Sequence, residues 1–265
     1  GVKASLPDNN LRCMHKIDDK RIFIGTANGL CLLNVETESI ERIDLNSLTN
    51  YKSTKIDVSK IISFNDDEIM IATYTDGLYI YNHKKKTATH ISKFDRRNAI
   101  SDNYIFDAFK DINGSVWIAT YAGLNRFENN LANFSTVSLF QNGYILSINY
   151  FLEMNDEEFL VGTESGIKIF NINDQSIKDF KTYFNSKEDY FESLYVYSLY
   201  LDEGGYLWVG TRNDGLFIYD IKTDKVINVS EEFEIPNLTH AIVRGIEHDN
   251  YGNMWVATNI GLCRI

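Results

Sequence analysis

Gly205-Tyr-Leu-Trp-Val-Gly-Thr211, followed by Gly215-Leu-Phe-Ile-Tyr-Asp220, is one copy of a pattern that runs through the whole chain. A small residue followed by Thr lies at its centre, and this pair occurs six times: Gly25-Thr26, Ala72-Thr73, Ala119-Thr120, Gly162-Thr163, Gly210-Thr211 and Ala257-Thr258. Successive threonines are 47, 47, 43, 48 and 47 residues apart, and Gly-Leu or Gly-Ile follows each of them after three or four residues. Repeats of about 40–50 residues have the size of a four-stranded propeller blade. The chain is therefore an array of similar units.

The residues before each Thr predict a strand that is apolar on both faces. Large apolar residues stand three positions before the Thr: Phe23, Met70, Trp117, Leu160, Trp208 and Trp255. Ile or Val stands two positions before it in every copy. Because neighbouring side chains of a strand point to opposite faces, such a sheet must be covered on both sides. We expect an all-β β-propeller in which the small residue marks a close approach of the neighbouring blade.

The rest of each copy fits four strands. An apolar segment at 104–109, 144–150, 195–201 or 241–247 predicts the innermost strand. A turn such as Asp202-Glu-Gly-Gly205 leads into the second strand, where Gly supplies a positive φ. The third strand follows the Gly-Leu pair, and a weaker segment such as 225–229 completes the blade. No stretch predicts a helix of useful length.

Length and charge limit the possible roles. We expect residues 1–265 to form one propeller domain with six repeats and an incomplete last blade. The net charge of −11 argues against nucleic acid as a partner, because binding of phosphates needs clustered Lys and Arg. Three cysteines, Cys13, Cys31 and Cys263, give neither a disulfide framework nor metal-ligand spacing, and we expect no cofactor. No run of about 18 apolar residues predicts a membrane span.

The two ends of the chain bear on whether the propeller closes. The chain begins with Gly1 and no signal peptide, which we interpret as a processed or excised piece. An inner strand is expected at 11–17, and the sequence stops within a third strand at Ile265. Residues 2–6 are the alternative source of the missing outer strand and would close a six-bladed ring. We favour a segment of a seven-bladed or double propeller.

The 205–220 stretch resembles the two-component regulator propeller repeat, whose motif is approximately Gly-x-Leu-Trp-Ile-Gly-Thr-x(2–3)-Gly-Leu-x-x-Tyr-Asp. Gly252-Asn-Met-Trp-Val-Ala-Thr258 and Gly114-Ser-Val-Trp-Ile-Ala-Thr120 match nearly as well, whereas copies one, two and four lack the Gly and Trp. Ala99-Ile-Ser-Asp-Asn-Tyr104 is similar to the element between repeats of that family.

This resemblance implies a periplasmic sensor domain of a hybrid two-component histidine kinase. In that family such propellers precede a membrane helix, a kinase and a DNA-binding regulator, none of which is in this chain. The ligand implied is an oligosaccharide, the receptor is expected to be a homodimer, and the location is the periplasm, as the ectodomain of an inner-membrane receptor. The domain itself would bind no nucleic acid and would meet the membrane only through absent segments.

We expect the binding site among the loops between the second and third strands, which differ in every copy while the framework repeats. Ring faces and planar polar groups suited to sugars occur there, and we predict these ligand-binding residues: Tyr74, Asp76, Tyr121, Arg212, Asn213 and Asp214. Any one of them is also compatible with an ordinary solvated loop. Trp117, Trp208 and Trp255 share one repeat position and are interpreted as framework.

Enzymatic activity is not expected, and no catalytic residue is predicted. Asp111 and Asp249 stand three residues before their Gly rather than two, and no Ser precedes them in the Asp-box pattern of sialidases. The five histidines fall at unrelated places in the repeat, which argues against a repeated metal or lyase site. The alternatives left open are a propeller for protein interaction or dimerisation and, less favoured, a glycosidase or lyase.

Overall fold

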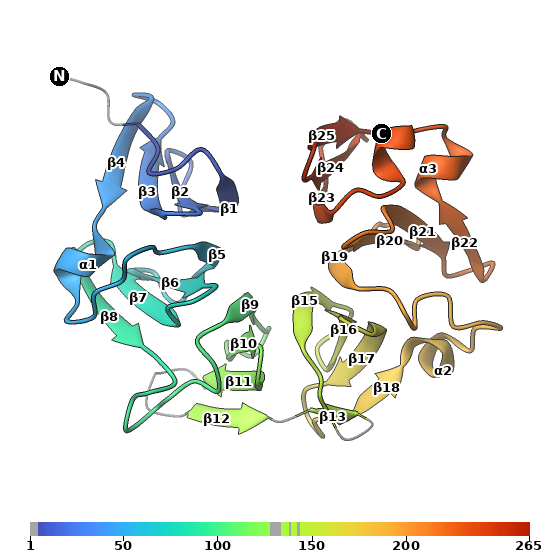
Figure 1. The fold of residues 1–265 in the computed structure, drawn as a ribbon, viewed down its shortest axis with the longest axis horizontal. Coiled ribbons are helices and arrows are strands. Elements are labelled where there is room, and N and C mark those ends of the chain that lie inside the picture. Colours follow the sequence, from blue (N-terminus) through green and yellow to red (C-terminus); the bar gives the residue numbers. More distant parts are fainter. Residues whose placement is uncertain (1–4, 128–133, 138, 142–143) are drawn as a thin grey trace. The chain divides into compact units, whose positions relative to one another are not determined.

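The computed structural model describes residues 5–127, 134–137, 139–141 and 144–265 (Figure 1). The chain divides into two compact units, an N-terminal unit of residues Gly1–Ile145 and a C-terminal unit of residues Leu146–Ile265. Each unit is built of antiparallel sheets whose strands follow one another in sequence order.

The N-terminal unit contains three four-stranded sheets. Their strands are β1 (Leu11–Lys16), β2 (Arg21–Thr26), β3 (Gly29–Asn34) and β4 (Ser39–Ile43); β5 (Val58–Ser63), β6 (Glu68–Thr73), β7 (Leu78–Asn82) and β8 (Thr87–Ile91); and β9 (Ile105–Lys110), β10 (Val116–Thr120), β11 (Gly123–Phe127) and β12 (Phe134–Val137). A short hairpin, β13 (Phe140–Gln141) and β14 (Tyr144–Ile145), follows them.

The C-terminal unit contains two four-stranded sheets and one three-stranded sheet. Their strands are β15 (Ile148–Glu153), β16 (Glu158–Thr163), β17 (Gly166–Asn171) and β18 (Ile177–Asp179); β19 (Val196–Leu201), β20 (Tyr206–Thr211), β21 (Leu216–Asp220) and β22 (Lys225–Asn228); and β23 (Val243–His248), β24 (Met254–Thr258) and β25 (Gly261–Arg264). The helices of the described residues are short: α1 (Leu45–Leu48), α2 (Phe180–Phe184), α3 (Val229–Glu232) and the 3₁₀ turn η1 (Pro236–Leu238). None of them is long and apolar enough to cross a membrane.

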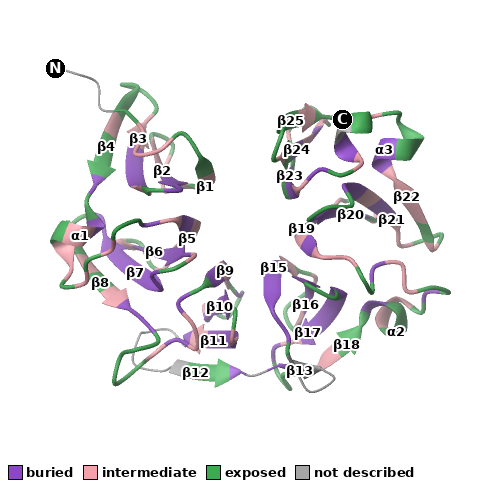
Figure 2. Cartoon of the chain, viewed as in Figure 1, coloured by how far each residue is buried: buried purple, intermediate pink, exposed green. Residues whose placement is uncertain are grey.

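The fold is an all-β β-propeller, as the repeats predict. Each Gly/Ala-Thr pair ends the second strand of its sheet. Within each unit, the first strands of consecutive sheets lie side by side. β5 lies between β1 and β9, and β19 lies between β15 and β23. Figure 2 shows β7 and β17 almost wholly buried, whereas the outermost strands β4, β8, β18 and β22 are mainly exposed or half-buried.

The core lies between consecutive sheets. Phe23 and Leu30 of the first sheet pack in one buried cluster with Val58, Ile69 and Tyr79 of the second. Similar clusters join the second sheet to the third, the fourth to the fifth and the fifth to the sixth. Apolarity on both faces of the second strand is therefore explained by sheets packed face to face.

The small residue before Thr is required by this packing. A Cβ added to Gly210 would lie 2.6 Å from Val243 Cγ1 of the next sheet. An added Cβ would lie 2.5 Å from Val58 Cγ1 at Gly25 and 2.8 Å from Val196 Cγ1 at Gly162. The predicted close approach of a neighbouring blade is thus confirmed at three copies.

The start of the fourth inner strand and the N-terminal residues were both subjects of prediction. The inner strand predicted at 144–150 begins only at Ile148, because Tyr144 and Ile145 pair with β13 instead. Residues 1–4 of the candidate closing strand lie outside the described residues, while Arg42 of β4 donates hydrogen bonds to the carbonyls of Ser5 and Leu6, both at 2.8 Å. The segment of a seven-bladed or double propeller stays the prediction, and closure by residues 2–6 stays its alternative.

Candidate functional site

The loop between the second and third strands is clamped in the same way in all six sheets. Thr211 Oγ1 donates to the carbonyl of Gly215 at 2.9 Å and accepts the Asp214 N–H at 2.9 Å. Each of the other five threonines makes the same two bonds. The Gly that receives the bond has a positive φ in every copy, 76° at Gly215, which explains why Gly recurs there. The Thr and Gly are therefore framework that fixes the loop.

A second repeated bond joins the loop to the entry of the first strand in five of the six sheets. The first loop residue donates its N–H to the carbonyl of the residue before that strand: Tyr74 to Asp57 at 2.9 Å, Tyr121 to Tyr104 at 3.0 Å and Arg212 to Tyr195 at 2.9 Å. Ala27 and Asn259 make the equivalent bond in the first and sixth sheets. The variable loop and the variable entry residue thus form one surface at the same end of each sheet.

A β-bulge adds a third variable position at this end. In every first strand the pairing register skips one residue, and the skipped residues are Arg12, Ser59, Phe106, Asn149, Tyr197 and Arg244. A bulge leaves its residue out of the ladder and turns its side chain, and bulges of this kind often stand beside functional sites. Six copies of one bulge therefore offer six positions free to vary.

In the N-terminal unit these positions build the Arg12 cluster, defined as Arg12, Asp57, Tyr74, Tyr104 and Phe106. Arg12 binds Asp57 through two bonds of 2.9 and 3.0 Å, and its guanidinium lies 5.5 Å from the centre of the Tyr74 ring. Tyr74 and Tyr104 have ring centres 5.4 Å apart, and Tyr104 and Phe106 5.0 Å. Burial alone would lower the pKa of Arg12, but the hydrogen bond and charge of Asp57 outweigh it and raise that pKa.

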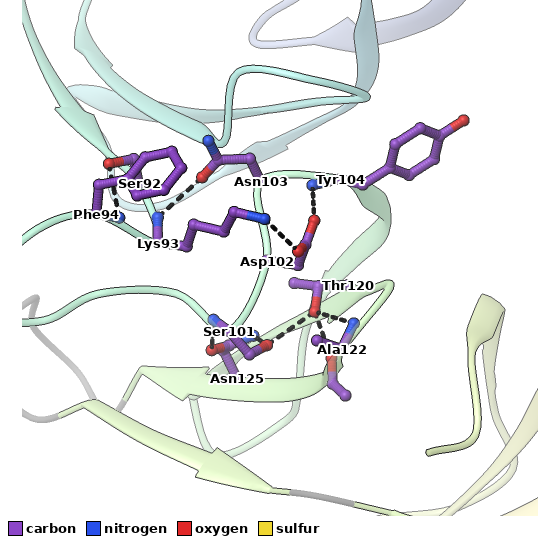
Figure 3. Close-up of polar contacts among 11 residues, drawn as sticks. Ser92, Lys93, Phe94, Ser101, Asp102, Asn103, Tyr104, Thr120, Ala122 and Asn125 are labelled. Atoms are coloured by element: carbon purple, nitrogen blue, oxygen red, sulfur yellow. Dashed lines mark hydrogen bonds and ion pairs between the residues drawn. The ribbon is translucent and has the colours of Figure 1, made fainter. Parts of the chain in front are cut away.

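The connection between the second and third sheets positions Tyr104 (Figure 3). Asp102 Oδ1 accepts the Tyr104 N–H at 2.8 Å, and Asp102 Oδ2 pairs with Lys93 Nζ at 2.8 Å. Ser101 Oγ lies 2.8 Å from Thr120 Oγ1, so the same connection is tied to the end of β10. Figure 3 shows the Tyr104 ring pointing away from this polar network. The Ser-Asp-Asn element thus sets where the entry residue stands.

The three predicted site residues of this unit lie in different environments. Tyr74 is half-buried within the Arg12 cluster, and Tyr121 is 64% exposed at its loop. Asp76 is only 7% exposed and accepts the Tyr51 hydroxyl at 3.0 Å. Burial and then this bond raise the pKa of Tyr51, whose ring stacks on His90 at 3.9 Å. The carboxylate of Asp76 therefore holds the segment that connects the first two sheets.

In the C-terminal unit the same positions build the Tyr195 cluster, defined as Tyr195, Tyr197, Arg212 and Arg244. The Arg212 guanidinium lies 5.0 Å from the centre of the Tyr195 ring, and that of Arg244 lies 5.3 Å from the Tyr197 ring. The two tyrosine rings meet edge to face with centres 5.1 Å apart. The predicted residues Arg212, Asn213 and Asp214 are all exposed. Of these three, Arg212 alone has a described ring contact.

Seven residues of these clusters were not predicted: Arg12, Asp57, Tyr104, Phe106, Tyr195, Tyr197 and Arg244. The signal was present, because the residue before each first strand varies between copies as the loops do: Asn10, Asp57, Tyr104, Ser147, Tyr195 and Ile242. Alignment of the copies on the first strand, in addition to the Thr, would have found the entry positions. The bulge itself leaves no sequence pattern.

Other features of the described residues are less suited to a site. No group of three or more His, Cys, Asp or Glu side chains in the described ranges could hold a metal ion. A cavity of about 240 Å³ in the N-terminal unit lies against α1 and is lined by Asn28, Arg42, Asp44 and Lys55 among others. Trp117, Trp208 and Trp255 each donate an indole N–H to the Asp six residues earlier, at 2.9, 3.1 and 2.8 Å, which supports their interpretation as framework.

Repeated blades with a constant frame and variable loop ends place the chain among the β-propeller repeat proteins. Residues 190–213 match the family model of the two component regulator propeller, so the resemblance inferred from the 205–220 stretch is confirmed. No curated protein matches the chain in sequence.

Solved structures with the same fold include extracellular domains of bacterial receptors. The extracellular domain of the putative hybrid two component system BT3049 from B. thetaiotaomicron is 21% identical with a TM-score of 0.79, and that of BT4673 is 23% identical with a TM-score of 0.76. Each comparison covers 100% of this chain and 34% of the other, so the chain spans about a third of those domains. PorZ, a surface component of the type-IX secretion system of Porphyromonas gingivalis, is 15% identical with a TM-score of 0.70, over 97% of this chain and 40% of PorZ. At these identities the likeness concerns the fold.

Proposed function

We propose that this chain is a sensor propeller of a hybrid two-component receptor, which binds an oligosaccharide and passes the signal to a C-terminal kinase outside the chain. The family match at residues 190–213 and the shared fold with receptor extracellular domains support this role. The domain lies in the periplasm as the ectodomain of an inner-membrane receptor, and the full receptor is a homodimer.

The observation that carries the proposal is the collection of tyrosines and guanidinium groups at the loop ends of both units. Tyrosine presents a large apolar face with a polar tip, and a sugar ring offers C–H faces and hydroxyls in complementary positions. The Arg12 cluster and the Tyr195 cluster each combine such rings with an arginine. The frame around them repeats while these positions differ, as expected where binding is added to a constant scaffold.

Binding is tested by calorimetric titration with oligosaccharides chosen from a glycan array. We expect Tyr121→Ala and Tyr195→Ala to weaken binding several-fold, because ring stacking contributes about 1 kcal/mol beyond burial. Tyr251→Ala is the matched control, since Tyr251 is 91% exposed in the β23–β24 turn at the other end of its sheet. Equal losses in all three variants, or none in the first two, would contradict the assignment of the loop end as the site.

Binding without turnover distinguishes a sensor from a propeller enzyme. The oligosaccharide incubated with the chain should be recovered intact by chromatography. Stoichiometric binding followed by accumulation of shorter or unsaturated products would replace the sensor proposal by a glycosidase or lyase.

A protein-interaction propeller is the second candidate, and one observation favours it. Ile260 and Leu262 of the sixth sheet are 63% and 65% exposed, whereas Leu30, which corresponds to Leu262 in the first sheet, is 1% exposed. Because this position packs against the following sheet in other copies, the exposed face would accept either a further sheet or a protein partner. If the full receptor binds oligosaccharide and this chain binds none, the chain is a scaffold of this kind.

A further inference from the structure

The Tyr195 cluster contains two exposed arginines for which the described part of the chain supplies no ion-pair partner. Arg212 and Arg244 lie on the faces of Tyr195 and Tyr197. Among the described residues, no carboxylate forms an ion pair with either guanidinium. Asp214 lies in the same loop as Arg212, and its backbone N–H donates to Thr211 Oγ1. Two positive charges thus stand together on one surface.

Arg12 occupies the same repeat position as Arg244 and has a partner of opposite charge. Arg12 and Arg244 are both the residue skipped by the bulge of their first strand. Arg12 donates two hydrogen bonds to the carboxylate of Asp57, the entry residue of the following sheet. Arg244 belongs to the last sheet of this chain, so it has no following entry residue to compare with Asp57, whereas Arg212 of the fifth sheet has no ion-pair partner among the described residues although the sixth sheet follows it.

We propose that the Tyr195 cluster binds the anionic group of an acidic oligosaccharide, a carboxylate of a uronic acid or a sulfate ester. This inference rests on the proposed function and specifies its ligand class. A guanidinium has five N–H donors in a planar fork that fits the two oxygens of a carboxylate or sulfate. A cation–π contact with a tyrosine ring holds each guanidinium in place, 5.0 Å from the Tyr195 ring centre and 5.3 Å from that of Tyr197.

The tyrosines also give a reason for a sugar rather than a free anion. Tyr195 and Tyr197 meet edge to face, so their rings present two differently inclined surfaces beside the two guanidinium groups. The Tyr195 hydroxyl lies 3.5 Å from Asn149 Oδ1, and Asn149 Nδ2 donates to the carbonyl of Val196 at 3.1 Å. Asn149 thus contacts both the Tyr195 hydroxyl and the backbone of the next residue, Val196, and the cluster is a prepared surface for a ring next to an acidic group.

A glycan array that carries neutral, uronate-containing and sulfated oligosaccharides tests the inference on the whole chain. We expect the bound glycans to be acidic, and the uronate and sulfate arms identify which anion is used. On the best acidic binder, Arg212→Gln and Arg244→Gln should each raise the Kd about tenfold, the loss of one charge-assisted hydrogen-bond pair. Binding should also weaken as the salt concentration rises.

The control variant is Lys225→Gln, which removes one exposed positive charge from β22 at the opposite end of the fifth sheet and should leave the Kd unchanged. Preference for neutral glycans, or binding that is insensitive to both arginine variants, would overturn the inference while the proposed sugar sensor stands. Binding of no glycan by the folded chain would contradict the proposed function itself.

Discussion

The small residue before each Thr marks the place where the next sheet comes closest to the backbone. An added Cβ at Gly210 would lie 2.2 Å from Ser198 Oγ and 2.6 Å from Val243 Cγ1. We therefore expect Gly210→Ala to lower the free energy of unfolding by about 1–3 kcal/mol, the usual cost of overpacking. Gly245→Ala is the control, because its Cβ would meet only Ala257 Cβ at 3.8 Å and should change stability by less than about 0.5 kcal/mol. Urea denaturation measures both, and equal stability of the two variants would contradict close packing at Gly210.

The repeated Thr is expected to matter through its hydroxyl. In Thr211→Val the Asp214 N–H loses its partner and the buried carbonyl of Gly215 keeps only the backbone N–H of residue 211, at 3.0 Å, which should cost about 1–3 kcal/mol. Thr258 makes the same bonds in an exposed environment, so Thr258→Val should cost less because water replaces the hydroxyl. A comparison of the two melting temperatures checks this, and an equal or larger loss for Thr258→Val would be the contrary result.

Single residues also show the limit of prediction from sequence. Asp76 and Asp214 occupy the same loop position of two copies, and both were predicted to bind ligand. Asp214 is exposed, whereas Asp76 is buried by Tyr51, which is 25 residues away in the segment between two sheets. The contact depends on how that connection folds, and nothing in the repeat pattern encodes it.

At the scale of elements, the Asp-to-Trp turn before the second strand predicts a pH dependence. Hydrogen bonds from the Trp255 indole and from Asn253 hold the pKa of Asp249 far below its usual range. The contribution of Asp249 to stability is therefore fully present above pH about 4, the ordinary pKa of Asp, and is lost as the pH falls toward the folded-state pKa. We expect Asp249→Asn to be less stable than the wild type at pH 7 and the difference to shrink below pH 4.

Denaturation followed by tryptophan fluorescence across pH 2 to 7 tests this turn, with Trp255→Phe as the companion variant that removes the indole donor. Trp255→Phe should weaken the same pH dependence in the acid range. A stability difference between wild type and Asp249→Asn that stays constant from pH 7 to pH 2 would contradict the role of the charged carboxylate.

Most elements could be predicted because the repeat fixes them six times. The second strands, the positive φ of the Gly before Leu, and the apolarity of both faces follow from residues that recur at one position. The bulge in each first strand could not be predicted, because its residue type follows no pattern among the copies, from Arg12 to Asn149 to Tyr197. The candidate site was found only in part for this reason, since bulge and entry positions supply all but one residue of each cluster.

In the whole molecule, the residues that recur in every copy pack the sheets together, and the loop end of the sheets is the proposed binding surface. Trp117 belongs to the frame: it is fully buried, and its indole donates to Asp111. Trp117→Ala should therefore lower the unfolding free energy by about 3–5 kcal/mol, as a core truncation. The residual folded protein should still bind oligosaccharide at low temperature. Loss of binding without loss of stability would place Trp117 in the site instead.

Hydrogen–deuterium exchange with and without the bound oligosaccharide tests the central claim most directly, because it reports on every sheet at once. We expect slower exchange in peptides that contain the strand entries and loops, residues 57–76, 104–123 or 195–215. Exchange should not change in the hairpins at the other end of the sheets, such as residues 82–87 and 220–225. Protection confined to those hairpins would contradict the assignment of the loop end as the binding surface.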